Sequence, residues 1–185
     1  ETDQLGLSRI AYQFMAGILS HMKEMTILTN PLVNSYKRLV PGYDAPIYIA
    51  WSPTSNRSSL IRIPSPRGEG TRIELRCPDS AMNPYLALAV CLAAGLDGIR
   101  SKIMPPDSID RNLFEMSEEE LKEAGVEKLP MNLMEACQEF EKDEYIKNVL
   151  GNDLVQKYTQ AKKKEYEEYV TQVTEWELNK YLHRI

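Results

Sequence analysis

Residues 47–76 read IYIAWSPTSNRSSLIRIPSPRGEGTRIELR. The stretch contains three short runs rich in β-branched or aromatic residues, at 47–51, 59–63 and 72–76, with proline, serine and glycine between them. Runs of this length and composition, bounded by such turns, are typical of β-strands. The stretch therefore predicts strands of an antiparallel sheet.

Helical patterns lie on both sides of these strands. From Ser8 to Leu28, apolar residues recur every three to four positions, which indicates one amphipathic helix. After Asn83-Pro84, an N-cap followed by proline at the first helical position, the apolar run 85–96 predicts a helix buried on nearly all sides. We expect it to end at Gly95 or Gly98.

The remainder of the chain is also expected to be helical. Ser117 and Glu120 form a capping box for a short surface helix, and a long helical segment covers 153–182. An antiparallel sheet with helices before and after it in the chain corresponds to the fold class α+β.

Composition and charge exclude several functions. The 185 residues can bury one sizeable core, and a net charge of −5 with a pI near 5.2 argues against non-specific binding of nucleic acid or membrane surfaces. The three cysteines have no metal-site spacing, which is typical of buried thiols in a reducing cytosol. No run approaches the ~18 apolar residues of a spanning helix, and residues 1–4 lack the order of a signal peptide. These features predict a cytoplasmic protein.

The strand at 71–76 carries the most specific chemistry. Its period of two sends Arg72, Glu74 and Arg76 to one face, and Ile73 and Leu75 to the core. Cations on both sides should depress the pKa of the carboxyl group and leave it able to bind a hard metal ion. The alternative is a self-neutralising, solvated sheet face.

Arginines on the preceding strand favour a ligand. Arg57 and Arg62 can each bind a phosphate or carboxylate through two hydrogen bonds. Together with Glu74 they suggest a phosphoryl-transfer site that neutralises charge beside a divalent metal. The glycine-containing loop 65–70 could close over a nucleotide.

Several motifs, in one order, resemble bacterial and archaeal type I glutamine synthetase, from about Leu5 to the C-terminus. They are Asn30-Pro31, NSYKRLVPGY at 34–43, Asn56-Arg57-Ser58, IRIP at 61–64, RIELR at 72–76, Asn83-Pro84-Tyr85 and AGLDGI at 94–99. The resemblance implies part of a catalytic half-barrel packed with helices. It also implies ATP-dependent ligation of ammonia to L-glutamate through γ-glutamyl phosphate, with Mg²⁺ or Mn²⁺.

The resemblance also implies roles for individual residues. Arg38 and Arg76 would hold glutamate, Arg57 would stabilise the transferring phosphoryl group while also contacting glutamate and nucleotide, and Arg62 would bridge ATP phosphates. Arg72 would lie toward the nucleotide, and Glu74 would bind the metal. Asp44 would be the catalytic and glutamate-binding residue of the flap, although the family usually carries glutamate there.

The resemblance places residues 1–103 and 104–185 in one catalytic domain, the second portion being its helical C-terminal region. The β-grasp domain and the other metal ligands would lie upstream, so the chain alone is expected to be inactive. His21 is expected on a helix surface and His183 in the tail.

The C-terminal segment has two interpretations. Its apolar residues could pack on the sheet. In the resembled family the segment instead inserts into the facing ring of a double hexamer, through Trp176, Tyr181, Leu182 and Ile185. Alternatives to a glutamine synthetase are a γ-glutamyl ligase for another amine and a non-catalytic scaffold or regulatory piece.

Overall fold

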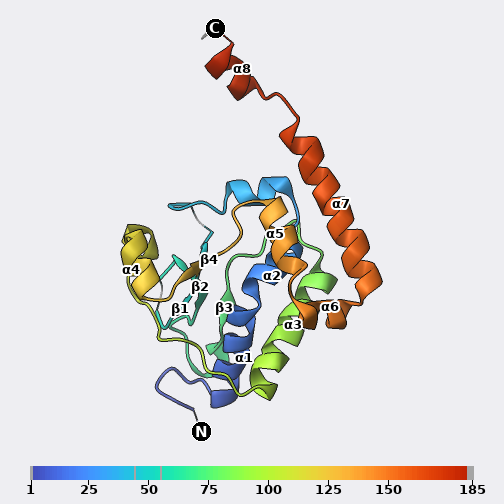
Figure 1. Ribbon diagram of the computed structural model, residues 1–185. Helices are drawn as coiled ribbons and strands as arrows, with labels where there is room; N and C mark the ends of the chain where they lie inside the picture. The colour runs from blue at the N-terminus through green and yellow to red at the C-terminus, as the bar shows by residue number, and fades with distance from the viewer. Residues whose placement is uncertain (1, 44, 55, 183–185) are drawn as a thin grey trace.

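The computed structural model describes residues 2–43, 45–54 and 56–182 (Figure 1). In chain order the elements are α1 (Arg9–Ser20), α2 (Met22–Thr29), η1 (Val33–Lys37), β1 (Tyr48–Ser52), β2 (Ser59–Arg62), η2 (Gly68–Gly70), β3 (Glu74–Leu75), α3 (Pro84–Arg100), η3 (Leu113–Glu115), α4 (Glu118–Glu123), β4 (Glu127–Lys128), α5 (Leu133–Phe140), α6 (Glu144–Leu150), α7 (Asn152–Val170) and α8 (Glu175–Tyr181). The predicted α+β class is confirmed.

The strands form one four-stranded sheet in the order β3-β2-β1-β4. The β2–β3 and β1–β4 pairs are antiparallel, but β1 and β2 run parallel, with Tyr48 opposite Ser59. The sheet is therefore mixed, and the expectation that all its pairs are antiparallel was wrong. Ser59, the first residue of β2, lies opposite Tyr48, the first residue of β1, so the two strands run in the same direction and form no hairpin.

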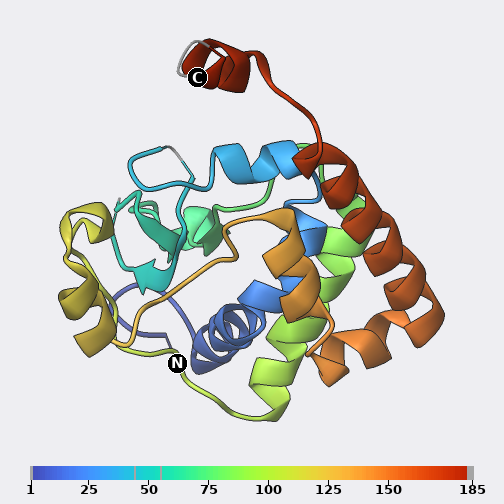
Figure 2. The same cartoon turned by 45° about the horizontal axis from the view of Figure 1, so that its top comes forward.

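A helical layer packs beside the sheet, and α1 and α3 make an extensive contact within it (Figures 1 and 2). A Cβ atom on Gly98 would lie 2.1 Å from the main-chain oxygen of Gln13, and one on Gly95 would lie 2.1 Å from the ring of Phe14. The helix α3 continues through both glycines to Arg100, so the predicted end at Gly95 or Gly98 was wrong. These glycines permit close helix packing.

One face of α3 is exposed to solvent. Tyr85, Leu88 and Leu92 are 84%, 67% and 55% exposed, whereas Ala87, Val90 and Ala94 on the opposite face are buried. The prediction of a helix buried on nearly all sides was therefore wrong. The apolar composition of residues 85–96 did not show which of these side chains would be buried against neighbouring elements.

The predicted helix from Ser8 to Leu28 is divided at His21. Ser8 caps α1, and His21 leaves helical geometry with φ −102° and ψ 10° before α2 begins at Met22. The His21 ring is 15% exposed and lies between two carboxylates, with Nδ1 2.6 Å from Asp143 and Nε2 3.0 Å from Asp97. His21 is thus an internal link between helices, and its assignment to the helix surface was wrong. His183 lies outside the described residues.

The C-terminal segment also consists of two helices. Along α7, Val155 and Thr159 are buried, and the ring of Tyr158 lies 6.4 Å from that of Phe140 on α5. By contrast, α8 has no buried residue and stands away from the body in both views (Figures 1 and 2). The interpretation in which the last apolar residues pack on the sheet was therefore wrong for α8.

The hydrophobic core includes residues from the strands, from α1 to α3, and from the region after residue 103, such as Leu113, Phe140 and Ile146. Cys77 and Cys137 are buried and Cys91 is partly buried, all as free thiols. Across the described ranges, no helix combines the length and apolar character required to cross a membrane.

Candidate functional site

Glu74 and Arg62 face each other across the antiparallel β2–β3 pair. Arg62 Nε donates to Glu74 Oε2 over 2.6 Å, and Arg72 Nε donates to Oε1 over 2.8 Å. Glu74 therefore lies between two guanidinium groups, as the sequence suggested. However, they belong to Arg62 and Arg72, and not to Arg72 and Arg76, because the neighbouring strand brings Arg62 into register.

These contacts control the charge of Glu74. The hydrogen bond from Arg62 is the largest influence and lowers the pKa of the carboxyl group, with Arg72 adding to it against the opposing effect of burial. Since the carboxyl side chain remains 25% exposed, a negative charge is held in place at a surface open to solvent.

The other face of β3 packs inward. Ile73 and Leu75 contact the core and line an apolar hollow of about 270 Å³ together with Phe14 and Ile18. The predicted alternation along 72–75 thus separates a charged face from an apolar one.

Arg76 and Arg57 are brought together just beyond β3. Arg76 donates from Nη1 to the main-chain carbonyl of Arg57. Asn56 Oδ1 accepts hydrogen bonds from the Ser58 N–H over 3.0 Å and from its hydroxyl over 2.7 Å. The Ser58 hydroxyl oxygen in turn accepts from the Leu113 N–H over 2.9 Å. The turn that carries the exposed Arg57 is therefore fixed on both sides.

Arg38, at the end of η1, joins the same surface through residues that follow β3. Its Nη2 donates to Asn30 Oδ1 over 2.7 Å and to the Cys77 carbonyl, and its Nε lies 3.5 Å from Asp79 Oδ2. Contacts along residues 74–79 therefore connect the predicted residues. We refer to these residues as the arginine site: Glu74, Arg38, Arg57, Arg62, Arg72 and Arg76.

The arginine site carries a local excess of positive charge within an acidic chain. Guanidinium groups pair with carboxylate and phosphate oxygens through directed hydrogen bonds. The arrangement can therefore bind anions around an ionised carboxylate. Asp44, the remaining predicted residue, lies outside the described residues, next to the exposed Tyr43.

Comparison with known proteins identifies the family. The model for the catalytic domain of glutamine synthetase matches residues 1–181. The chain belongs to the glutamine synthetase family.

Curated glutamine synthetases confirm the predicted bacterial and archaeal resemblance. The chain is 52% identical to that of Clostridium saccharobutylicum over 184 residues, 52% identical to that of Methanococcus voltae over 176 residues, and 50% identical to that of Thermotoga maritima over 181 residues. These alignments cover 95–100% of this chain but only 39–41% of each relative. The chain thus spans about two-fifths of the length of these relatives.

Solved structures agree with this assignment. The GmaS/ADP complex in conformation 1 matches with a TM-score of 0.83 and 38% identity, over 98% of this chain and 41% of that chain. GmaS without ligand matches with a TM-score of 0.78 and 36% identity, over 99% and 40% of the two chains. The structural comparison therefore agrees with the family that the sequence comparison identified.

In a glutamine synthetase, Glu74 would be one metal ligand. Within the described ranges, no group of three or more histidine, cysteine, aspartate or glutamate side chains is arranged to hold a metal ion. Mg²⁺, however, keeps several waters and commonly uses one or two carboxylates together with substrate phosphates. Each carboxylate oxygen can accept more than one interaction, so Glu74 fits the role of a single ligand even while it is paired with Arg62 and Arg72.

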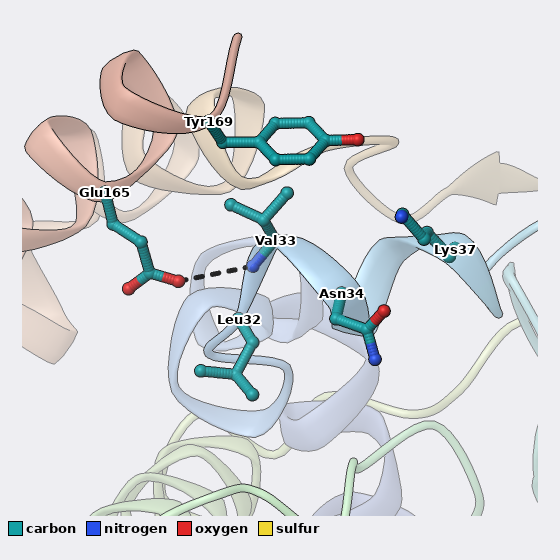
Figure 3. Close-up of a pocket in the computed structure, with 6 residues that line it drawn as sticks. All are labelled: Leu32, Val33, Asn34, Lys37, Glu165 and Tyr169. Atoms are coloured by element: carbon teal, nitrogen blue, oxygen red, sulfur yellow. Dashed lines mark hydrogen bonds between the residues drawn. The ribbon is translucent and has the colours of Figure 1, made fainter. Parts of the chain in front are cut away.

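A surface hollow of about 350 Å³ is lined by residues that do not belong to the arginine site (Figure 3). It is lined by Leu32, Val33, Asn34, Lys37, Glu165 and Tyr169. In Figure 3, Tyr169 of α7 extends over Val33 of η1, and Glu165 Oε1 accepts from the Val33 N–H over 3.4 Å. The hollow therefore marks the seam between α7 and the segment that leads to Arg38, and it contains no predicted site residue.

Two residues near Arg38 received no role from the sequence. Asn30 is fully buried, and Asp79 is half-buried. Asn30-Pro31 belongs to the motifs that identified the family, but only the structure shows what its side chain contacts. A buried polar residue at a helix end was the available signal, because such a group requires a partner.

Proposed function

We propose that this chain contributes to the active site of a glutamate–ammonia ligase, which forms L-glutamine, ADP and phosphate from L-glutamate, ammonia and ATP. The observation that carries the proposal is the pairing of Glu74 with Arg62 and Arg72, in a chain 50–52% identical to glutamine synthetases. In this reaction the γ-carboxylate of glutamate attacks the terminal phosphoryl group of ATP, which releases ADP. Ammonia then displaces phosphate from the resulting acyl phosphate.

Arg38 and Arg76 are proposed to bind glutamate. Arg38 is held through Nε and Nη2, and Arg76 is held against the Arg57 carbonyl, so both guanidinium groups are oriented before a ligand arrives. Preorganised cations reduce the ordering cost of binding a carboxylate. We assign the flap residue Asp44 to contact glutamate and to accept a proton as ammonia attacks.

Arg57, Arg62 and Arg72 are proposed to act on the nucleotide side. Negative charge accumulates on phosphoryl oxygens during transfer, and fixed guanidinium groups stabilise it. Arg57, which lies on a fixed turn and is exposed, is assigned to the transferring group and to glutamate. Arg62 and Arg72 are assigned to ATP phosphates.

Glu74 is proposed to provide one oxygen ligand for Mg²⁺ or Mn²⁺, which would neutralise phosphate charge when bound. The lowered pKa of Glu74 supports this role, because a metal ligand must be deprotonated. Arg62 and Arg72 keep the carboxylate ionised and hold its orientation through hydrogen bonds to both oxygens.

We further propose assembly into a double hexameric ring in the cytoplasm, with residues 1–103 and 104–185 as portions of one catalytic domain. The exposed apolar side chains at the C-terminal end support the assembly: Val173, Trp176, Leu178, Tyr181 and Leu182. A helix with exposed apolar side chains, which buries none of its residues within the described part of the chain, is suited to pack against another subunit.

The proposal is tested with the full-length protein that carries this chain. Purified protein should form glutamine from ATP, glutamate and ammonia, and should do so faster than it uses methylamine. Arg57→Ala should lower kcat by about 100-fold or more. Arg100→Ala is the matched control, because Arg100 is exposed at the end of α3, a helix that carries no residue of the arginine site.

Absence of glutamine formation would refute the proposal, and a preference for methylamine would favour a γ-glutamyl ligase for another amine. We also propose that the 185-residue chain alone is inactive. Detectable turnover by that chain would refute this part.

A further inference from the structure

Asn30 ends α2 and is fully buried beside Arg38. Its Nδ2 donates to the hydroxyl oxygen of Thr29 over 3.1 Å, and its Oδ1 accepts from Arg38 Nη2 over 2.7 Å. The Asn30 N–H donates to the Thr26 carbonyl over 2.7 Å, so the main chain is fixed as well. A buried amide oxygen in this position is costly to leave without a donor.

The remaining contacts of Arg38 return to the same helix end. Arg38 Nε lies 3.5 Å from Asp79 Oδ2, and the Asp79 N–H donates to the Thr29 carbonyl over 2.8 Å. Asp79 Oδ1 also accepts the Ala81 N–H over 2.9 Å. Thr29 and Asn30 therefore hold both Arg38 and its acidic neighbour in place.

These contacts leave one end of the guanidinium group available. Nε and Nη2 donate to protein atoms, and no hydrogen bond from Nη1 is found within the described ranges. The shortest contact of Arg38 with another side chain is with the neutral amide of Asn30, at 2.7 Å, and the carboxylate of Asp79 is farther away, at 3.5 Å. Asn30 can therefore fix the direction of Arg38 without neutralising its charge.

We propose that Asn30 is a positioning residue for Arg38 that aims Nη1 at the carboxylate of the substrate. The inference rests on the proposed function, in which Arg38 binds glutamate. It assigns glutamate affinity to a residue that does not itself contact the ligand. The donor geometry of an arginine is specific only when its plane is held, because guanidinium–carboxylate pairs are directional.

The test uses full-length protein and measures glutamate and ATP affinity by calorimetry, which requires no turnover. Asn30→Leu removes the acceptor at similar volume and should weaken glutamate binding by roughly tenfold, while ATP affinity stays unchanged. Thr26→Val is the matched control. Thr26 is also fully buried on α2, but its hydroxyl donates to the Met22 carbonyl over 2.7 Å, away from Arg38. The Thr26→Val variant should lower the free energy of unfolding while preserving the affinities for glutamate and for ATP.

A double-mutant cycle with Arg38→Ala separates positioning from a structural effect. In the Arg38→Ala background, Asn30→Leu should not weaken glutamate binding further. Equal weakening in both backgrounds, or the same glutamate affinity for Asn30→Leu as for Thr26→Val, would overturn the inference.

If Asn30→Leu does not fold, Asn30→Asp serves in the same cycle. It keeps an acceptor but adds negative charge beside Arg38, and should weaken glutamate binding severalfold only when Arg38 is present. If Arg38→Ala leaves glutamate affinity unchanged, the assignment of Arg38 fails and this inference fails with it, whereas glutamine formation by the unaltered enzyme remains a separate result.

Discussion

Arg62 and Glu74 occupy directly opposite positions on β2 and β3, and Arg62 Nε lies 2.6 Å from Glu74 Oε2. Arg72 approaches the other carboxylate oxygen, with Nη2 at 2.7 Å. The carboxylate is therefore oriented by one cation from the neighbouring strand and one from its own segment. This relationship is the basis of the first prediction.

Glu74→Gln in the full-length protein should raise the Mg²⁺ concentration for half-maximal activity by about tenfold or more, because a neutral amide is a weaker metal ligand. The two arginines would also lose a charged partner. Because all three side chains are partly exposed, unfolding free energy should fall by only about 1 kcal/mol. Metal titration and urea denaturation measure the two effects.

Glu118→Gln is the matched control for Glu74. Glu118 pairs with Lys128 over 2.5 Å, is 76% exposed and lies outside the arginine site. An equal shift in the metal titration for both variants would contradict the assignment of Glu74.

His21 should make stability depend on alkaline pH. Hydrogen bonds from its ring to Asp143, and then to Asp97, raise the pKa of His21 from 6.5 to about 9 against the opposing effect of burial. Glu24 on α2 also interacts electrostatically with His21, and the Tyr145 ring on α6 stacks on the imidazole. Since both ring nitrogens face carboxylates, the doubly protonated imidazolium is the form that satisfies them.

The folded-state pKa of His21 is above its unfolded value, so the stabilisation is fully present below about pH 6.5 and is lost as the pH rises through about 9. We expect the free energy of unfolding to fall by on the order of 2 kcal/mol between pH 6.5 and 10. Urea denaturation at several pH values measures this change. His21→Gln should remove most of this dependence. Parallel curves for the two proteins across this range would refute the prediction.

Gly98→Ala should destabilise the α1–α3 contact. The added methyl group would lie 2.1 Å from the Gln13 carbonyl oxygen, which belongs to the main chain and cannot move by a side-chain rotation. We expect a loss of about 3 kcal/mol or failure to fold, measured by thermal unfolding. Arg100→Ala, at an exposed position on the same helix, should change stability by less than about 0.5 kcal/mol. Similar melting curves for both variants would show that the helices can separate without cost.

Removal of residues 175–185 should change assembly but not the fold of the remaining protein. Because α8 buries no side chain on its own chain, the melting temperature of the subunit core should be unchanged. The full-length protein should sediment as single rings after the truncation, because four of the exposed apolar side chains that we propose join the rings are gone: Trp176, Leu178, Tyr181 and Leu182. An intact double ring would contradict that proposal.

Sequence reasoning located the local features well. The Asn83-Pro84 cap and the Ser117–Glu120 capping box occur as predicted, because each depends on residues within one helical turn. The charged and apolar faces of 72–75 also follow from the period of a strand. Long-range features were harder to predict: the parallel β1–β2 pair depends on the register of Ser59 with Tyr48, and the division at His21 depends on Asp97 and Asp143.

The sequence by itself determined the family and the types of elements, and it named the residues that we propose form the arginine site, because motifs, caps and strand periodicity are local in the chain. Only the tertiary structure decided which side chains meet. It paired Glu74 with Arg62 instead of Arg76, and it placed Asn30 against Arg38. The physical reason is that such pairs depend on strand register and on helix packing between distant segments, which local sequence pattern does not specify.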